Sequence, residues 1–254
     1  MGIFEQNSRN SRTRVGQNLM QAIILNAGRG KRLKPLTDNT HKSLLTINNK
    51  SILEHQIDTL KQIGVRRVIM VTGYRAKQLE AAARQMQGIE WKFVNNPEFE
   101  TTENIVSFYL AVPYLKEETY VMMGDIMFEV SILQSLQKTN HPVAIATRSR
   151  SIYSSDDMKV IWRDHEMHLK KISKNLVNPN AEYLQISYFG RNGADLAQIF
   201  AQQMMANRVH HSWYPELLQR MADNGHSIEC QLVAGNWQEI DTLEDLHNAQ
   251  RTII

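Results

Sequence analysis

The sequence contains a single cysteine, Cys230, so no disulfide bond can form within the chain. A lone cysteine is typical of an inert thiol in a reducing compartment, and we expect a cytoplasmic protein. No apolar run approaches the ~20 residues that a membrane-spanning helix needs, so we expect no membrane partner. Glycine (12) and proline (6) are also too few among 254 residues for a collagen-like or low-complexity chain.

An excess of charge of one sign is also missing. The 29 basic and 26 acidic residues leave a net charge of +3, which argues against nucleic acid as the main partner. Hydrophobic residues make up 42% of the chain, which is enough apolar material for a folded core.

The first residues differ in character from the rest. Residues 1–19 are polar and rich in Arg, Asn and Ser, without a periodic apolar face. A transit peptide is disfavoured, because Glu5 is present and the amphipathic stripe is missing. Met20 stands just before the first predicted strand and would make a natural start. We therefore expect 1–19 to be a flexible tail and 20–254 to be a single domain.

Apolar runs alternate with segments of helical periodicity from residue 21 to residue 148. The predicted strands are 22–25, 68–71, 91–94, 120–123 and 143–147, and the predicted helices are 52–63, 76–87, 104–111 and 132–137. This alternation indicates right-handed βαβ crossovers and a mostly parallel sheet in an α/β fold.

After residue 148 the rhythm changes. Strands are predicted at 158–162, 168–173, 183–189 and 228–233, and helices at 193–205, 213–223 and 243–246. The first three of these strands follow one another without helices between them, so an antiparallel or mixed edge of the sheet is expected.

The loop after the first predicted strand carries the strongest chemical signal. Within residues 25–33, Gly28 and Gly30 allow backbone N–H groups to approach a bound anion. The dinucleotide-binding fingerprint and the Walker A loop both fail, because the third glycine and the Gly-Lys-Ser/Thr are missing. A Gly-x-Gly-x-Arg loop remains. Its Arg32, with Lys42 further on, places two cations beside an anion cradle, as a polyphosphate requires.

Two segments resemble a known signature. AIILNAGRGKRLKPLT at 22–37 and HKSLL at 41–45 are similar to the nucleotidyltransferases that make sugar and alcohol diphosphonucleotides. Asn26 replaces the usual alanine and His41 replaces the usual proline. Neither change removes a charged group, so only the local backbone is expected to differ.

The resemblance implies a fold and a set of roles. The fold is the Rossmann-like, three-layer fold of the nucleotide-diphospho-sugar transferases, with a mostly parallel mixed sheet. Arg32 and Lys42 would be catalytic. The residues implied to contact the nucleotide in this loop are Leu25, Ala27, Gly28 and Gly30.

Two aspartates are candidates for binding a metal. Asp125 follows Gly124 at the carboxyl end of a predicted strand, where open α/β sheets place ligand-binding groups. Asp241 alone favours a helix N-cap, with Thr242 as a competing cap. The segment EIDTLEDL at 239–246, however, resembles a family segment whose aspartate binds Mg²⁺ together with the aspartate of the central strand. The resemblance therefore implies a two-carboxylate Mg²⁺ site.

The segment NNPEFETTENIVSFYLA at 95–111 indicates the subfamily. It is similar to bacterial phosphocholine, inositol-phosphate and phosphonate cytidylyltransferases, which implies CTP as the donor. The amide of Asn104 offers both a donor and an acceptor for the edge of cytosine. A plain capping or turn role for Asn104 is an equal alternative.

The second half of the chain carries candidates for binding the acceptor. Lys174 resembles a family lysine that holds the acceptor phosphate. Glu182 stands where relatives have Gly-Glu, although Ala181 replaces the glycine. Trp213 and Tyr214 are candidates to line a pocket for an amine by cation–π contact, or to fill the core of an amphipathic helix. The histidines show no zinc-binding spacing.

These features predict a Mg²⁺-dependent enzyme that transfers CMP from CTP to a small phosphomonoester or phosphonate, such as phosphocholine, and releases pyrophosphate. One alternative is a sugar-1-phosphate nucleotidyltransferase that uses UTP, dTTP or GTP. The other is a non-catalytic nucleotide-sensing domain on the same fold. The sequence does not determine the oligomeric state, and a homodimer is one possibility.

Overall fold

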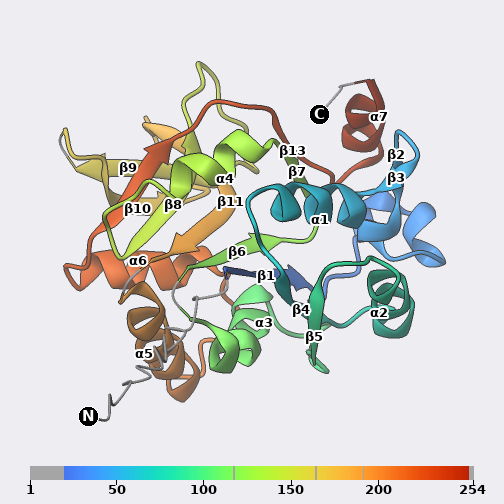
Figure 1. Ribbon diagram of the computed structural model, residues 1–254. Coiled ribbons are helices and arrows are strands. Elements are labelled where there is room, and N and C mark those ends of the chain that lie inside the picture. The colour runs from blue at the N-terminus through green and yellow to red at the C-terminus, as the bar shows by residue number, and fades with distance from the viewer. Residues whose placement is uncertain (1–19, 117, 164, 191, 252–254) are drawn as a thin grey trace, which may run out of the picture.

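A nine-stranded mixed sheet runs through the computed structural model, which describes residues 20–116, 118–163, 165–190 and 192–251 (Figure 1). The predicted tail 1–19 lies outside the described residues. The strands, in sheet order, are β5 (Glu90–Asn95), β4 (Arg67–Thr72), β1 (Gln21–Asn26), β6 (Thr119–Met123), β11 (Ala181–Phe189), β8 (Val143–Arg148), β12 (Ile228–Leu232), β10 (His168–Ser173) and β9 (Lys159–Arg163).

Helices cover both faces of this sheet and give three layers. The helices are α1 (Ile52–Gln62), α2 (Ala76–Arg84), α3 (Asn104–Ala111), α4 (Val130–Leu136), α5 (Gly193–Ala206), α6 (Pro215–Asp223) and α7 (Leu243–Arg251). In Figure 1, α1 and α4 lie on one face, and α3, α5 and α6 lie on the other. Not one helix in the described ranges is long and apolar enough to cross a membrane.

The predicted α/β fold with a mixed sheet is confirmed. β5, β4, β1 and β6 are parallel, as expected from the βαβ pattern. The prediction of an antiparallel edge is correct for β9 and β10 but wrong for β11. That strand lies in the middle of the sheet, antiparallel to both β6 and β8. Sequence order does not determine sheet order, because the chain returns to the centre after forming the edge.

Local sequence explains why these elements begin where they do. α1 has a capping box, in which the Ser51 side chain accepts from the Glu54 N–H and the Glu54 carboxylate accepts from the Ser51 N–H. The whole of β1 is buried, as its continuous apolar run predicted. Cys230 is buried in the core, where burial raises the pKa of its thiol, in agreement with an inert cysteine.

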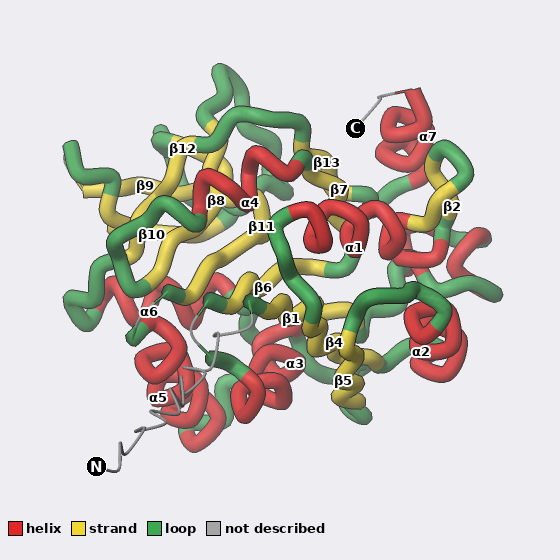
Figure 2. The backbone as a smooth tube through the Cα atoms, viewed as in Figure 1, coloured by secondary structure: helices red, strands yellow, loops and turns green. Residues whose placement is uncertain are grey.

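Short elements that the periodicity did not reveal position the candidate site. β7 (Ile126–Phe128) pairs antiparallel with β13 (Trp237–Glu239), and Figure 2 shows these two strands side by side near α1. A second small pair is formed by β2 (Thr46–Ile47) and β3 (Lys50–Ser51). Strands of two or three residues are too short to show an alternating pattern. The β7–β13 pair joins the chain just after Asp125 to the chain just before Asp241.

Candidate active site

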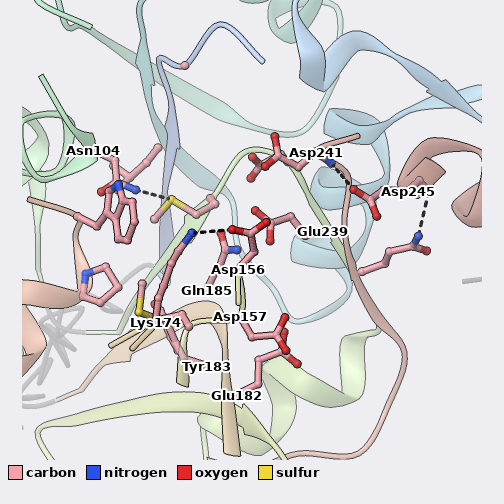
Figure 3. A pocket seen from close by; sticks show the side chains of 18 of the residues that line it. Asn104, Asp156, Asp157, Lys174, Glu182, Tyr183, Gln185, Glu239, Asp241 and Asp245 are labelled. Atoms are coloured by element: carbon pink, nitrogen blue, oxygen red, sulfur yellow. Dashed lines mark hydrogen bonds and ion pairs between the residues drawn. The ribbon is translucent and has the colours of Figure 1, made fainter. Parts of the chain in front are cut away.

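A pocket of about 840 Å³ opens at the carboxyl ends of β1 and β6. Ten of the twelve predicted site residues line it: Leu25, Ala27, Gly28, Arg32, Lys42, Asn104, Asp125, Lys174, Glu182 and Asp241. Gly30 lines a neighbouring cavity of about 260 Å³, together with Arg32 and Lys42. Tyr214 is fully buried and is not among the lining residues of either cavity. Figure 3 shows the larger pocket from close by.

The glycine loop folds against Lys42. Gly30 has a φ of 66°, and a Cβ added there would lie 3.0 Å from the Cβ of Lys42. Only glycine accommodates both this backbone conformation and this close approach without strain. A Cβ at Gly28 would lie 3.8 Å from Lys42 Nζ, so the ammonium stands over the first glycine. The Thr37 hydroxyl donates a hydrogen bond of 2.8 Å to the Gly30 carbonyl and holds the turn. The loop and Lys42 therefore form one cationic cradle.

Lys42 forms an ion pair with Asp125 inside the pocket. Both side chains are largely buried, with exposed fractions of 13% and 10%. The pair uses Oδ2 of Asp125, while Oδ1 is buried and has no hydrogen-bond partner among the described residues. A buried carboxylate oxygen without a partner is unfavourable, so this atom is available for a ligand.

Arg32 forms an ion pair with Asp241 at the mouth of the pocket. The helix-cap alternative for Asp241 is not what the structure shows. The cap of α7 is Thr242, whose hydroxyl accepts from the Asp245 N–H at 3.1 Å, and the Asp245 carboxylate accepts from the Thr242 N–H at 2.8 Å. Because Thr242 caps the helix, the Asp241 carboxylate is left to face Arg32.

The two departures from the family signature belong to one buried network. The ring of His41 contacts the backbone carbonyl of Asn26 at 3.1 Å through Nε2 and accepts the Ser43 N–H at 3.2 Å through Nδ1. The Ser43 hydroxyl lies 2.7 Å from the side-chain oxygen Oδ1 of Asn26 and donates to the Gly124 carbonyl at 2.6 Å. Burial, and then the charge of Lys42, lower the pKa of His41 to about 3, so the imidazole is neutral. The network links the strand before the cradle to the strand before Asp125.

Glu239 also lines the pocket, although it was not among the predicted site residues. Burial, and then the charge of Asp125, raise its pKa to about 7, while hydrogen bonding from the Gln185 side chain opposes the rise. Glu239 lines the pocket with Asp125 and Asp241. Its place at the start of the segment 239–246, two residues before Asp241, was the usable signal.

The structure places Asn104 and Tyr214 differently from the roles predicted for them. The Asn104 side-chain oxygen accepts the backbone N–H of Tyr214 at 2.6 Å, and its amide nitrogen contacts Met123 Sδ at 3.4 Å. Asn104 therefore presents mainly its N–H₂ group to the pocket, rather than a free donor and a free acceptor. The prediction that Tyr214 lines an acceptor pocket is wrong. Its ring packs in the core against Phe108, with 4.9 Å between ring centroids.

The far side of the pocket carries the predicted acceptor residues. Lys174 lies over the ring of Trp213 at 4.4 Å and 3.9 Å from Asp156. Glu182 is buried between two guanidinium groups, at 3.3 Å from Arg148 and 3.4 Å from Arg150. Lys174 already covers the ring face of Trp213, and Glu182 is already paired with two guanidinium groups. Neither Trp213 nor Glu182 is therefore a free site for an amine.

Comparison with known proteins places these residues in a family. A model of the MobA-like NTP transferase domain matches residues 22–226, which is most of the chain. The chain belongs to the MobA-like NTP transferases. The predicted resemblance to nucleotidyltransferases is thereby confirmed, and the protein is an enzyme of the nucleotidyltransferase class.

Among its relatives, this NTP transferase is 38% identical over 109 residues to the choline-phosphate cytidylyltransferase of Streptococcus pneumoniae. That match covers 42% of this chain and 44% of the relative. A match to the CMP-5'-(3-aminopropyl)phosphonate synthase of Streptomyces rubellomurinus, at 31% identity, covers 50% of this chain and 20% of that protein. The chain therefore spans less than half the length of these two relatives.

Two further matches extend over nearly the whole NTP transferase chain. The CTP:phosphoglutamine cytidylyltransferase of Campylobacter jejuni is 24% identical, over 89% of this chain and 98% of that protein. The structure of the inositol-1-phosphate CTP transferase from T. maritima superposes with a TM-score of 0.77 at 23% identity, covering 92% and 96% of the two chains. The latter confirms the nucleotide-diphospho-sugar transferase fold.

The carboxylates of this NTP transferase fit a hard divalent cation. Within the described ranges, no group of three or more His, Cys, Asp or Glu side chains is arranged to hold a metal ion. Mg²⁺, however, is usually held by one or two carboxylates together with phosphate oxygens and water. The unpartnered Oδ1 of Asp125 points to a missing ligand at this place. Asp125 and Asp241 are therefore the residues that would hold the ion.

Proposed function

We propose that this NTP transferase moves CMP from CTP to a small phosphomonoester or phosphonate and releases pyrophosphate. One observation carries the proposal. A single pocket has cations on two sides, with Arg32 and Lys42 at the glycine loop and Lys174 on the far side. Cations on two sides fit two phosphorylated substrates.

The roles of the side chains follow from their positions. Arg32 and the backbone of the glycine loop neutralise the charge that develops on the leaving pyrophosphate. Lys42 lies deeper, beside Asp125, and bridges the α-phosphate and the incoming acceptor. Lys174 holds the acceptor phosphate from the opposite wall. The attacking phosphate oxygen is already anionic near neutral pH, so no general base is required.

Asp125 and Asp241 would hold Mg²⁺. When bound, the ion supplies polarisation of the α-phosphate and a fixed orientation for the triphosphate. The ion pairs with Lys42 and Arg32 keep both carboxylates inside the pocket until the metal and the nucleotide arrive.

Three observations support CTP as the donor. The segment 95–111 is similar to cytidylyltransferases, and relatives are named for choline phosphate, phosphoglutamine and a phosphonate. Asn104 lines the pocket, and its amide N–H₂ group can donate to N3 of cytosine, which is an acceptor where uracil and thymine carry an N–H. The charged groups expected of an enzyme are all present in one pocket, which speaks against a sensing domain that only binds a nucleotide.

The experiment is a screen of pyrophosphate release with four nucleoside triphosphates. The acceptors are phosphocholine, phosphoethanolamine, aminoethylphosphonate, polyol phosphates and sugar 1-phosphates. We expect a kcat/KM for CTP about tenfold or more above that for UTP, dTTP or GTP, because one hydrogen bond to a base edge contributes about 1 kcal/mol, close to a factor of ten. The Asp125→Asn variant is the background control. Equal kcat/KM values for CTP and UTP would overturn the choice of donor and favour the sugar-nucleotide alternative.

A further inference from the structure

Arg29 stands between the two glycines of the cationic cradle, and its guanidinium has few partners in the protein. Within the part of the chain that the structure describes, this guanidinium makes no hydrogen bond. It forms an ion pair in which Nη1 lies 3.7 Å from Oε1 of Glu100, which is too long for a hydrogen bond. Its Nε is buried and has no hydrogen-bond partner among the described residues. The guanidinium therefore has donor groups to offer to an anion.

The side chain of Arg29 is nevertheless held in place by an aromatic ring. Its guanidinium carbon lies 5.1 Å from the centre of the Tyr74 ring, which is a cation–π contact. Tyr74 is itself fixed at two points. Its N–H donates to the Ala27 carbonyl at 2.9 Å, and its hydroxyl donates to the Thr37 carbonyl at 2.7 Å. A guanidinium that rests on a fixed ring has less conformational freedom to lose when it binds a ligand.

Arg29 lines the cavity of about 260 Å³ beside the main pocket. Most of the eight residues that line this cavity are charged, with four cations and two acids: Arg29, Lys31, Arg32, Lys42, Glu100 and Asp241. Such an excess of positive charge favours an anion that carries several charges. Arg32 and Lys42 line both cavities, so a polyphosphate bound at the cradle can extend from the pocket into this smaller cavity.

Arg75 lies over the same aromatic ring but has a different set of contacts. Its guanidinium carbon is 5.6 Å from the centre of the Tyr74 ring. Its Nε donates to the Tyr74 hydroxyl at 3.2 Å, and its Nη2 donates to the Asp38 carbonyl. It lines neither cavity. Of these two arginines, only Arg29 combines unused donors with a place on the wall of a cationic cavity.

We propose that Arg29 is a second arginine, beside Arg32, for the two phosphates that leave as pyrophosphate, and that it exchanges Glu100 for them when the nucleotide binds. The proposal rests on the proposed function of the pocket and extends it to the smaller cavity. In the transfer, the bond from the α-phosphorus to the oxygen it shares with the β-phosphate breaks, and that oxygen leaves with the pyrophosphate. A planar guanidinium can hold two oxygens of such a group at once. The Glu100 side chain is 62% exposed, so water can solvate its carboxylate after the exchange.

The test measures the binding of CTP, CMP and pyrophosphate by calorimetry, with Mg²⁺ and without an acceptor. In Arg29→Gln the Kd for CTP and for pyrophosphate should rise about tenfold, the scale of losing one hydrogen bond to a charged group. The Kd for CMP should stay within about twofold, because CMP lacks both terminal phosphates. An equal rise for CMP in a folded variant would overturn the proposal, and so would unchanged Kd values for CTP and pyrophosphate.

Arg75→Gln is the matched control, because it removes a guanidinium from the same ring but not from the cavity. It should leave all three Kd values unchanged. Arg29→Lys is the second variant, for use if Arg29→Gln has a lowered Tm. It keeps the charge but not the planar fork, so it should weaken CTP and pyrophosphate about threefold and leave CMP unchanged. Wild-type Kd values for CTP and pyrophosphate in Arg29→Lys would show that the fork is not used.

A double-mutant cycle tests the exchange with Glu100. Glu100→Gln removes the competing carboxylate and should lower the Kd for pyrophosphate about twofold, as expected for an exposed ion pair. In the Arg29→Gln background the same change should have no effect. Equal gains in both backgrounds would overturn the exchange. Because pyrophosphate is the probe, the cycle does not depend on the donor base. A wild type that binds pyrophosphate but transfers no nucleotide would contradict the proposed function, while the cycle would still decide the role of Arg29.

Discussion

The Lys42 ammonium donates a hydrogen bond to the Asp125 carboxylate, although the two residues lie 83 positions apart in the chain. Arg32 and Asp241 form the same kind of pair across 209 positions. Each pair joins a cation suited to a phosphate with a carboxylate suited to a metal. Without ligand the four charges satisfy one another, so none is left buried and unpaired. A metal–triphosphate complex brings both signs of charge and can exchange partners with both pairs at once.

The first prediction concerns the two carboxylates. Asp125→Asn and Asp241→Asn should each lose most of kcat, because each removes a negative charge from the site that would hold Mg²⁺. The double variant should be little worse than either single variant, because one ion depends on both residues. The measurement is kcat as a function of Mg²⁺ concentration.

Asp58→Asn is the control for these variants, since Asp58 pairs with Lys50 on the surface at 2.7 Å, away from the pocket. It should keep wild-type kinetics. Near-normal turnover of Asp241→Asn would contradict the metal role and leave Asp241 as a partner of Arg32 only.

The second prediction concerns the guanidinium of Arg32. Its planar fork can hold two phosphate oxygens, whereas an ammonium acts as a point charge. Arg32→Lys should therefore lose about 10²-fold or more in kcat despite keeping its charge, the scale seen when one charge-stabilising donor is removed. Steady-state kinetics and an unchanged Tm check this. Wild-type kcat in Arg32→Lys would show that charge alone suffices.

Much of the fold was predictable because its strands and helices are long enough to show a period. The predicted elements are present, and the βαβ order of the first half gives its parallel sheet. The central place of β11 was not predictable, because strand order depends on long-range packing rather than on local pattern. The placement of Asp125 and Asp241 in one pocket depends on β7 and β13, which are too short to recognise from sequence.

Side-chain roles were less predictable than positions. Ten of the twelve predicted site residues line one pocket, because the motifs lie at the ends of strands that converge there. The direction in which Tyr214 points depends on α6, which buries its ring against Phe108. Which hydrogen-bonding atoms of the Asn104 amide are left for a ligand depends on the backbone N–H of Tyr214, 110 positions away in the chain. Neither fact is contained in a local sequence pattern.

The third prediction concerns Asp156, an exposed residue at the mouth of the pocket. Its carboxylate lies 3.5 Å from Arg32 and 3.9 Å from Lys174, the cations of the two substrate sides. An anion in this position competes with substrate phosphates. Asp156→Asn should therefore lower KM for the nucleotide and for the acceptor, by about twofold to fivefold, as expected for an exposed ion pair of modest strength.

The effect of Asp156→Asn should shrink as salt is added, because exposed ion pairs are screened. Asp223→Asn is the matched control, since Asp223 pairs with Lys171 at 3.3 Å and does not line the pocket. It should leave both KM values unchanged. A rise in KM for the acceptor in Asp156→Asn would instead show that this carboxylate binds the substrate.

The last prediction concerns pH and His41. Burial lowers the pKa of His41 to about 3 in the folded protein, below the ordinary value of 6.5. The unfolded chain therefore binds the proton more readily, and folding stability is lost as pH falls below 6.5. By about pH 5 this one residue should cost about 2 kcal/mol relative to neutral pH.

His41→Asn removes the titrating ring but keeps an acceptor for the Ser43 N–H. The variant should be less stable at pH 7, because its contact with the Asn26 carbonyl is lost. Its stability should nevertheless fall less steeply between pH 7 and pH 5, by about the same 2 kcal/mol. Urea unfolding across this range measures both effects, with His165→Asn as the control because His165 is exposed. A His41→Asn variant that loses stability as steeply as the wild type would show that His41 is not the group that titrates.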